Sequence, residues 1–169
     1  MRISVLEDNA LRCLSLLART GTKLTIGQIA ESEGLTDETA AKILARLREA
    51  GLVRSFRGKE GGYVLADAPE RISLAQALAG LGRPMFELER CHGDEETDAC
   101  VHTGGCGIRP VWMTLGQLVQ DYLSKITLAD LVHPEAQVTE HVDAVAAAVS
   151  ARPLPRAGCG GPPPAAGRN

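Results

Sequence analysis

The stretch from residue 25 to residue 65 constrains the fold more than any other part of the chain. Thr25 and Thr36 each precede a segment with helical apolar spacing, and Thr25 is followed three residues later by a glutamine, as in a capping box. Gly34 and Gly51 follow the two segments. A glycine in the left-handed conformation commonly ends a helix, so both segments are expected to end there. Two short helices joined by a turn that contains glycine predict a helix-turn-helix.

Two short strands are predicted directly after the second helix. Residues 52–57 and 62–65 flank the sequence Gly58-Lys59-Glu60-Gly61, whose glycines tolerate the backbone angles of a hairpin. Aromatic residues make up only 3% of the chain, so the core must consist mainly of Leu, Val, Ile and Ala, as is common in helical folds. We therefore expect a mainly α fold in which a winged helix-turn-helix domain carries a small β-hairpin wing.

A helix is expected on each side of this motif. Ser4 and Glu7 form a second capping-box pattern, which predicts a helix to about Thr20 with an apolar stripe along one side. Cys13 lies on that stripe and fits the description of a small buried apolar residue. Residues 73–76 predict a brief helix that ends at Gly80.

A long apolar face follows the cysteine-containing segment. Pro110 suits the first turn of a helix, and apolar residues then recur at helical steps: Val111, Leu115, Leu118, Val119, Tyr122 and Ile126. Such a face needs a partner, and the simplest partner is the same helix of a second subunit. We therefore expect a homodimer.

The chain divides into five parts in this interpretation. The winged helix-turn-helix domain, a type of domain that binds DNA, spans residues 1–84. A cysteine-bearing loop spans 85–107. The dimerisation helix and a short helical turn at 127–131 occupy 108–132. A C-terminal helix, clearest at 139–149, occupies 133–150, and a tail rich in Pro and Gly spans 151–169 and is expected to be disordered.

Charge and hydropathy narrow the class of protein. The formal net charge is -3, so contact with nucleic acid would require a locally basic surface. No run of 18 apolar residues and no signal-peptide pattern is present, which favours a cytoplasmic protein that does not contact membranes. No Cys-His pair with an orienting carboxylate can be placed on a regular element, so a thiol enzyme is disfavoured and we expect no enzymatic activity.

Positive charge is concentrated in the predicted helix-turn-helix and wing. Six basic residues and three acidic residues lie between residues 36 and 59. A helix in the major groove presents the side chains of its N-terminal half to base edges, and glycines at a wing tip allow a cation to enter the minor groove. An ordinary solvated helix face is the alternative, but the order of the elements favours operator DNA. The predicted DNA-binding residues are Glu38, Thr39, Lys42, Arg46, Arg57 and Lys59, with Arg46 on phosphate.

Three of the five cysteines are clustered. Cys91 and Cys100 are separated by eight residues, and Cys100 and Cys106 by five, in a segment rich in glycine. Thiolates are soft ligands that suit iron-sulfur clusters or zinc. Zinc sites usually contain close Cys-x2-Cys pairs, which are absent here, although His92 and His102 could complete a tetrahedron.

An iron-sulfur cluster bound by the three cysteines is therefore the favoured interpretation. Zinc and three thiols that are inert or respond only to redox chemistry remain as alternatives. Cys159, in the tail, has no ligand role in any of these interpretations.

The chain resembles the Rrf2 family of bacterial winged-helix regulators over about residues 1–132. The resemblance is carried by LEDNALRCL near the start, by LTDETAAKILARLREAGLVRSFRGKEGGYVL through the helix and wing, by the three cysteines, and by ITLADLV at 126–132. The family includes the IscR, NsrR and RirA groups. It implies a homodimer with a long dimerisation helix and an iron-sulfur cluster, 4Fe-4S or 2Fe-2S, on the three cysteines.

The resemblance also bears on the fourth ligand. The IscR type has a histidine three residues after the last cysteine, where this chain has Arg109. In the NsrR type the fourth ligand is a carboxylate near the start of the first helix, supplied by the other subunit. Asp8 resembles that ligand in this chain. An ion pair between Asp8 and Arg12, one helical turn apart, is the competing interpretation of Asp8.

The combined expectation is a DNA-binding transcriptional regulator, and specifically a repressor. Its cluster would sense nitric oxide, redox stress or iron status, with Cys91, Cys100, Cys106 and Asp8 as metal ligands. The alternative is a cluster-free winged-helix regulator that responds through thiol oxidation, zinc or a partner protein.

Overall fold

The first helix is fixed at both ends by its own sequence. The computed structural model describes residues 3–58, 61–82 and 106–151, and in it helix α1 spans Val5–Thr20. The Ser4 hydroxyl accepts a hydrogen bond from the Glu7 backbone N–H, and the Glu7 carboxylate accepts one from the Ser4 backbone N–H at 2.7 Å. These bonds to the carboxylate, first from the Ser4 backbone and then from its hydroxyl, lower the pKa of Glu7. Gly21, with φ 63°, ends the helix, so both predicted ends are confirmed.

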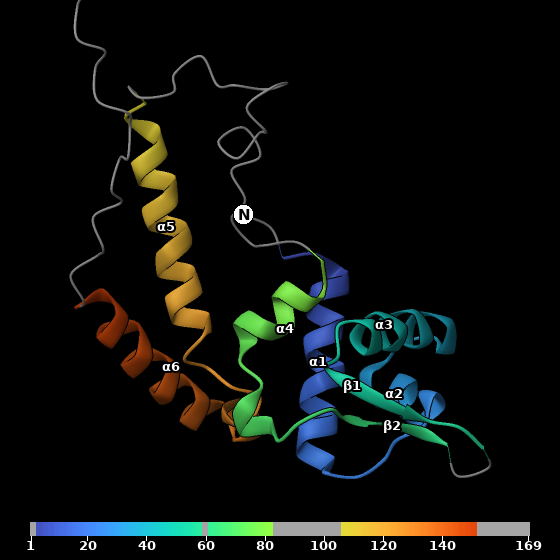
Figure 1. The fold of residues 1–169 in the computed structure, drawn as a ribbon. Coiled ribbons are helices and arrows are strands. Elements are labelled where there is room, and N and C mark those ends of the chain that lie inside the picture. Colours follow the sequence, from blue (N-terminus) through green and yellow to red (C-terminus); the bar gives the residue numbers. More distant parts are fainter. Residues whose placement is uncertain (1–2, 59–60, 83–105, 152–169) are drawn as a thin grey trace, which may run out of the picture.

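The predicted helix-turn-helix is confirmed. Helix α2 spans Ile26–Glu33 and helix α3 spans Asp37–Glu49, each with a threonine N-cap at Thr25 and Thr36. Gly34 ends α2 with φ 65° and turns the chain into α3. The two helices pack on each other and on α1, so α3 lies against both α1 and α2 (Figure 1).

The wing is an antiparallel hairpin of β1 (Val53–Phe56) and β2 (Gly62–Leu65). It is shorter than predicted at its first strand, because Leu52 and Arg57 lie outside the ladder. Leu24, between α1 and α2, adds a bridge on the other side of β2: its backbone N–H donates to Tyr63 at 3.1 Å and its carbonyl accepts from Tyr63 at 2.8 Å. The hairpin is thereby attached to the connection between α1 and α2.

A 3-10 turn, η1 (Pro69–Arg71), and helix α4 (Leu74–Gly80) follow the wing. Ser73 caps α4 as predicted, and η1 was not predicted. The Leu74 backbone N–H donates to the Ile126 carbonyl at 2.8 Å, and the Leu128 N–H donates to the Ile72 carbonyl at 2.9 Å. These bonds join the C-terminal part of the chain to the winged-helix domain.

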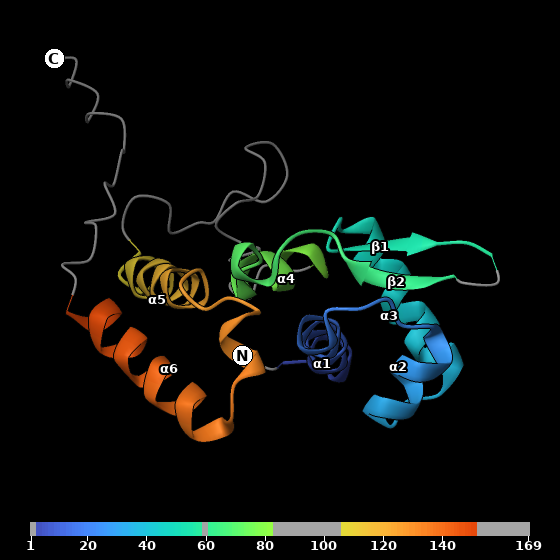
Figure 2. The ribbon, with the colours of Figure 1, turned by 90° about the horizontal axis from the view of Figure 1, so that it is seen from below.

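Helices α5 (Ile108–Leu123) and α6 (Glu135–Ser150) lie side by side, with the short turn η2 (Asp130–Val132) between them in sequence (Figures 1 and 2). One prediction is corrected here. Ile126 does not extend the face of α5, because the helix ends at Leu123 and Ile126 is buried beside α4. Helix α6 lies within the predicted 133–150, and it begins at Glu135, directly after its N-cap residue Pro134.

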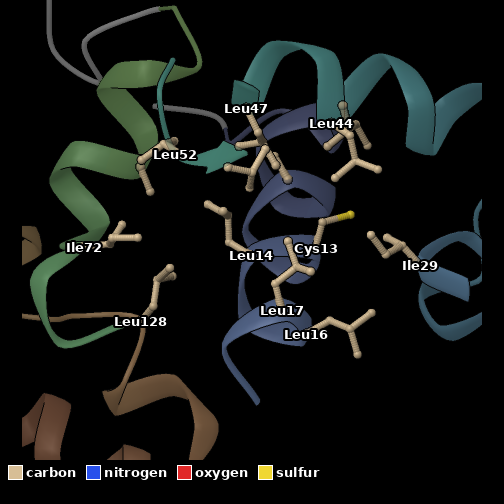
Figure 3. Close-up of a cluster of buried hydrophobic side chains, with 14 of the residues drawn as sticks. Cys13, Leu14, Leu16, Leu17, Ile29, Leu44, Leu47, Leu52, Ile72 and Leu128 are labelled. Carbon is tan, nitrogen blue, oxygen red and sulfur yellow. The ribbon is translucent and has the colours of Figure 1, made fainter. Parts of the chain in front are cut away.

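The core lies around α1. Its buried side chains come from the helices of the winged-helix domain, from the start of the hairpin and from the segment after α5, and Figure 3 shows Leu14, Leu44, Leu47, Ile72 and Leu128 among them. No helix in the described ranges is long and apolar enough to span a membrane. The tail from residue 152 and residues 83–105, which include most of the cysteine-bearing loop, lie outside the described residues.

Candidate DNA-binding surface and cysteine site

Helix α3 has one buried face and one exposed face. Ala40, Ile43, Leu44 and Leu47 are buried against the rest of the domain. Spacing along the helix therefore turns the predicted DNA-binding residues outward: Glu38, Lys42 and Arg46 are exposed, and Thr39 is half-buried.

Two of these residues are paired within the helix. The Lys42 ammonium lies 2.7 Å from a Glu38 carboxylate oxygen, and both side chains are exposed. An exposed pair one turn apart stabilises a helix by only about 0.3–0.5 kcal/mol. The pair can therefore open at little cost when either side chain binds another group. The Thr39 hydroxyl lies 2.8 Å from that of the N-cap residue Thr36.

Arg46 lies in a groove where three helices meet. The groove, of about 560 Å³, is lined by Glu7 of α1, Arg46 and Glu49 of α3, and Gly80 and Leu81 at the end of α4. Arg46 is thus at the exposed edge of α3 that faces the start of α1 and the end of α4. The predicted phosphate contact of Arg46 stays a prediction, and this junction has no signal in the sequence because it depends on the packing of α4.

Glycines stand on both sides of the wing tip. Gly58 has φ 104°, which favours glycine, and the Gly61 N–H donates to the Gly58 carbonyl at 2.8 Å. A Cβ on Gly61 would lie 2.8 Å from two backbone oxygens, so that position also requires glycine. Arg57 is exposed directly after β1. Lys59 lies outside the described residues.

Cys106 is the one member of the cysteine cluster within the described ranges. It is half-buried and stands two residues before the first residue of α5. The N-cap residue of α5 is Gly107, which has no side chain to cap the helix. The backbone N–H groups of the first turn favour a nearby negative charge. Cys91 and Cys100 lie outside the described residues. Within the described ranges, no group of three Cys, His, Asp or Glu side chains could hold a metal ion.

Asp8 lies in the first turn of α1. Its side chain is 55% exposed and a carboxylate oxygen accepts a hydrogen bond from the Arg12 guanidinium at 2.9 Å. The structure therefore contains the ion pair that competes with the ligand interpretation. Because the pair is exposed and weak, it does not prevent the carboxylate from binding elsewhere, and the ligand role of Asp8 stays a prediction.

Cys13 has the buried position predicted for it (Figure 3). Burial, with a smaller contribution from the negative charge of Glu33, raises the pKa of the thiol to about 12. The thiol is therefore protonated at neutral pH and is not a nucleophile or a metal ligand.

One contact at the wing was not predicted from the sequence. Lys23 lies in the connection between α1 and α2, and its ammonium is 5.8 Å from the centre of the Phe56 ring in β1. The residues are 33 positions apart in the chain. A single bridging residue, Leu24, has no periodicity that could have revealed a strand there.

Comparison with known proteins agrees with this architecture. The family model Rrf2, described as "Iron-dependent Transcriptional regulator", matches residues 4–134. The HTH-type transcriptional regulator IscR of Erwinia tasmaniensis is 31% identical over 108 residues, which cover 64% of this chain and 63% of the relative.

Two solved structures have the same fold. The global cysteine regulator CymR of B. subtilis superposes with a TM-score of 0.62 and 27% identity, covering 78% of this chain and 96% of CymR. IscR of T. potens superposes with a TM-score of 0.59 and 28% identity, covering 78% of this chain and 86% of IscR. These relatives are regulators and not enzymes. The chain belongs to the Rrf2 family of transcriptional regulators.

Proposed function

We propose that this regulator is a homodimeric repressor whose operator affinity is set by an iron-sulfur cluster. The observation that carries the proposal is the position of the cysteine cluster in the chain. Its last member, Cys106, lies two residues before the first residue of α5, and the segment that holds the other two follows α4 in the sequence. The segment that would bind the cluster therefore connects the winged-helix domain to the long helix α5.

The proposed DNA contacts divide by position. Glu38, Thr39 and Lys42 in the N-terminal half of α3 would contact base edges in the major groove, and Arg46 would contact phosphate. Arg57 and Lys59 would place the wing in the adjacent minor groove, where a narrow groove attracts cations. The exposure of Lys42, Arg46 and Arg57 supports this assignment.

The chemistry of the donor set fits a cluster. Cys91, Cys100 and Cys106 would supply three thiolates, and Asp8 of the partner subunit the fourth ligand. The start of α5 beside Cys106 favours negative charge, and the weak pair of Asp8 with Arg12 leaves the carboxylate available. When bound, the cluster would supply a group that nitric oxide, oxidation or loss of iron can alter, as the family resemblance implies.

The link to DNA would run through packed elements. Helix α4 ends in the groove that Arg46 lines, and the same groove contains Glu7, next to Asp8. A change in the position of the start of α1 or the end of α4 would therefore reach α3 directly. A coupling of about 1–3 kcal/mol would change operator affinity about 5-fold to 150-fold.

The first two turns of α5 support the dimer. Ile108, Val111, Trp112 and Met113 are all exposed in the isolated chain, although α6 covers another side of the helix. Four neighbouring large apolar side chains form a patch of the kind that subunit interfaces bury. A second copy would cover this patch and bring its own Asp8 into the assembly.

Anaerobic purification tests the cluster. We expect a brown wild-type protein with bound iron and sulfide and with visible absorption that is lost in Cys100→Ala and kept in Cys159→Ala. A colourless wild-type protein without iron would contradict the proposal. It would favour the alternative that the sequence leaves open, a cluster-free regulator that responds through thiol oxidation.

Asp8→Ala tests the fourth ligand, and Arg12→Ala is its matched control. Both variants remove the ion pair between these residues, but only the first removes the carboxylate. We expect an altered visible spectrum and altered reactivity toward nitric oxide in Asp8→Ala alone. If the two variants behave alike, Asp8 is not a ligand.

A salt series tests the DNA surface. The probe is the duplex that the wild-type protein enriches from randomised DNA. Lys42→Ala should weaken specific binding by about 1–3 kcal/mol, and Arg57→Ala should also weaken it. Lys125→Ala, an exposed position just after α5, is the control. Wild-type affinity and salt slope in both Lys42→Ala and Arg57→Ala would exclude the proposed surface.

A further inference from the structure

The wing has an additional attachment to the body of the domain. Leu24 pairs with Tyr63, so β2 lies between the Leu24 segment and β1. Gly62 of β2 is the register partner of Phe56 in β1, and the side chain of Lys23 reaches this position from the Leu24 segment. These three residues lie at the end of the hairpin next to the turn.

Glycine at position 62 makes room for the lysine. A Cβ built on Gly62 would lie 2.8 Å from Cγ of Lys23 and 2.7 Å from the Leu24 backbone oxygen. The stem of Lys23 thus occupies the space that a side chain at position 62 would need. The Lys23 side chain thereby crosses β2, and its ammonium lies 5.8 Å from the centre of the Phe56 ring.

Phe56 is an unusual residue for its position. It is 52% exposed on the solvent side of the hairpin, where burial in a core does not fix its ring. It also directly precedes Arg57, the wing residue proposed to enter the minor groove. An interaction that holds the Phe56 ring therefore holds the end of β1 from which Arg57 projects.

We propose that Lys23 is a positioning residue for the wing, acting through the Phe56 ring to hold the hairpin in the orientation that binds DNA. This inference rests on the proposed use of the wing in operator binding. An exposed cation over a phenylalanine ring is a modest interaction, and its loss is expected to weaken operator binding about two- to five-fold.

A double-mutant cycle on the enriched duplex tests the role of Lys23. Lys23→Met keeps the stem and removes the charge, and Phe56→Leu removes the ring. We expect each change to weaken binding two- to five-fold, and Lys23→Met to have no further effect once Phe56 is Leu. Lys23→Arg and Phe56→Tyr keep a cation and a ring and should bind like wild type. Lys125→Met is the charge-matched control.

The salt slope separates positioning from a direct contact. If Lys23 itself bound phosphate, Lys23→Met would reduce the slope of log affinity against log salt by about 0.9 in the wild-type and the Phe56→Leu backgrounds alike. That result would overturn the proposal, as would wild-type affinity in Lys23→Met. Failure of the wild-type protein to enrich any duplex would instead overturn the DNA-binding function on which the inference rests.

A measurement without DNA completes the test. The methylene protons of Lys23 should show upfield ring-current shifts in the NMR spectrum of the wild-type protein, and these shifts should disappear in Phe56→Leu. Lys23 methylene shifts at random-coil positions in the wild-type protein would overturn the proposed contact, whatever the DNA affinity.

Discussion

Cys13 and Cys106 show how position decides the chemistry of identical side chains. Cys13 is fully buried in the core beside α2 and α3, and its thiol has a pKa of about 12. Cys106 is half-buried at the start of α5, where helix N–H groups favour an anion. Only the second residue is placed to act as a ligand or a sensor.

Alkylation under native conditions tests this difference. In neutral buffer, iodoacetamide should modify Cys106 of the metal-free protein and leave Cys13 unmodified, because alkylation requires an accessible thiolate. Peptide mass spectrometry measures both sites. A sample unfolded in denaturant is the control and should be modified at both. Equal modification of the two cysteines in the folded protein would contradict the burial of Cys13.

Residues whose role depends on local spacing could be predicted from the sequence. The caps at Ser4, Thr25 and Thr36 and the burial of Cys13 were predicted, since helix ends and apolar faces follow patterns a few residues long. The contact of Lys23 with Phe56 was not, because only the packing of the wing brings the two residues together. The ligand roles of Cys91, Cys100, Cys106 and Asp8 remain predictions.

Among the elements, the close approach of α4 to the end of α3 depends on glycine. A Cβ on Gly80 would lie 2.8 Å from Cβ of Ala50 and 3.2 Å from Cδ1 of Leu52. Gly27, inside α2, differs in having nothing within 4 Å of the same position. The two glycines therefore form a matched pair for one substitution.

Gly80→Ala should lower the free energy of unfolding by about 1–2 kcal/mol, since α4 must move away from Ala50. Gly27→Ala should raise it by about 0.4–1 kcal/mol, because alanine restricts the unfolded chain and fits the helix. Urea unfolding measures both. Stabilisation by Gly80→Ala would show that α3 and α4 are less closely packed than described.

The turn between α5 and α6 is held by a carboxylate. Asp130 accepts hydrogen bonds from the Thr127 backbone N–H at 2.7 Å and from its hydroxyl at 2.8 Å, and His141 of α6 lies 3.6 Å away. Burial alone would raise the pKa of Asp130, but the bonds from Thr127 and the nearby His141 and His133 outweigh it. The pKa of Asp130 is therefore lower than its ordinary value of 3.8.

This shift predicts a pH dependence of stability. A carboxyl group with a lowered pKa in the folded state stabilises the protein above pH 3.8, and this contribution is lost as the pH falls through the lowered pKa. Asp130→Asn should therefore destabilise the protein near neutral pH, and its difference from wild type should shrink in acid. Asp143→Asn, an exposed position on α6, is the control. A difference that stays constant down to low pH would contradict the role of the Asp130 charge.

Prediction at the level of elements failed where tertiary contacts end a pattern. Ile126 continues the apolar spacing of α5 in the sequence, but the helix stops at Leu123 and the chain turns to bond with Leu74 and Ile72. The bridge at Leu24 was missed for the opposite reason, since one residue carries no pattern. Both features arise from the packing of distant segments.

In the whole molecule, α5 and α6 lie apart from the wing on the other side of α4 (Figures 1 and 2). The exposed apolar patch at the start of α5 is the surface proposed to join two subunits. Trp112→Glu should therefore convert the dimer to a monomer at micromolar concentration, because a charge would be buried in the interface. Sedimentation velocity measures the state, with Ala144→Glu on the exposed side of α6 as control. An unchanged dimer in Trp112→Glu would place the interface elsewhere.

The occupied cysteine site is proposed to change the affinity of the protein for DNA. The direct measurement is the Kd of one anaerobic preparation for the enriched duplex, before and after a chelator removes its iron, with Cys106→Ala treated in parallel. We expect the Kd of the wild-type protein to change at least five-fold and that of Cys106→Ala to stay the same. Equal Kd values for iron-loaded and iron-free wild-type protein would contradict the proposal.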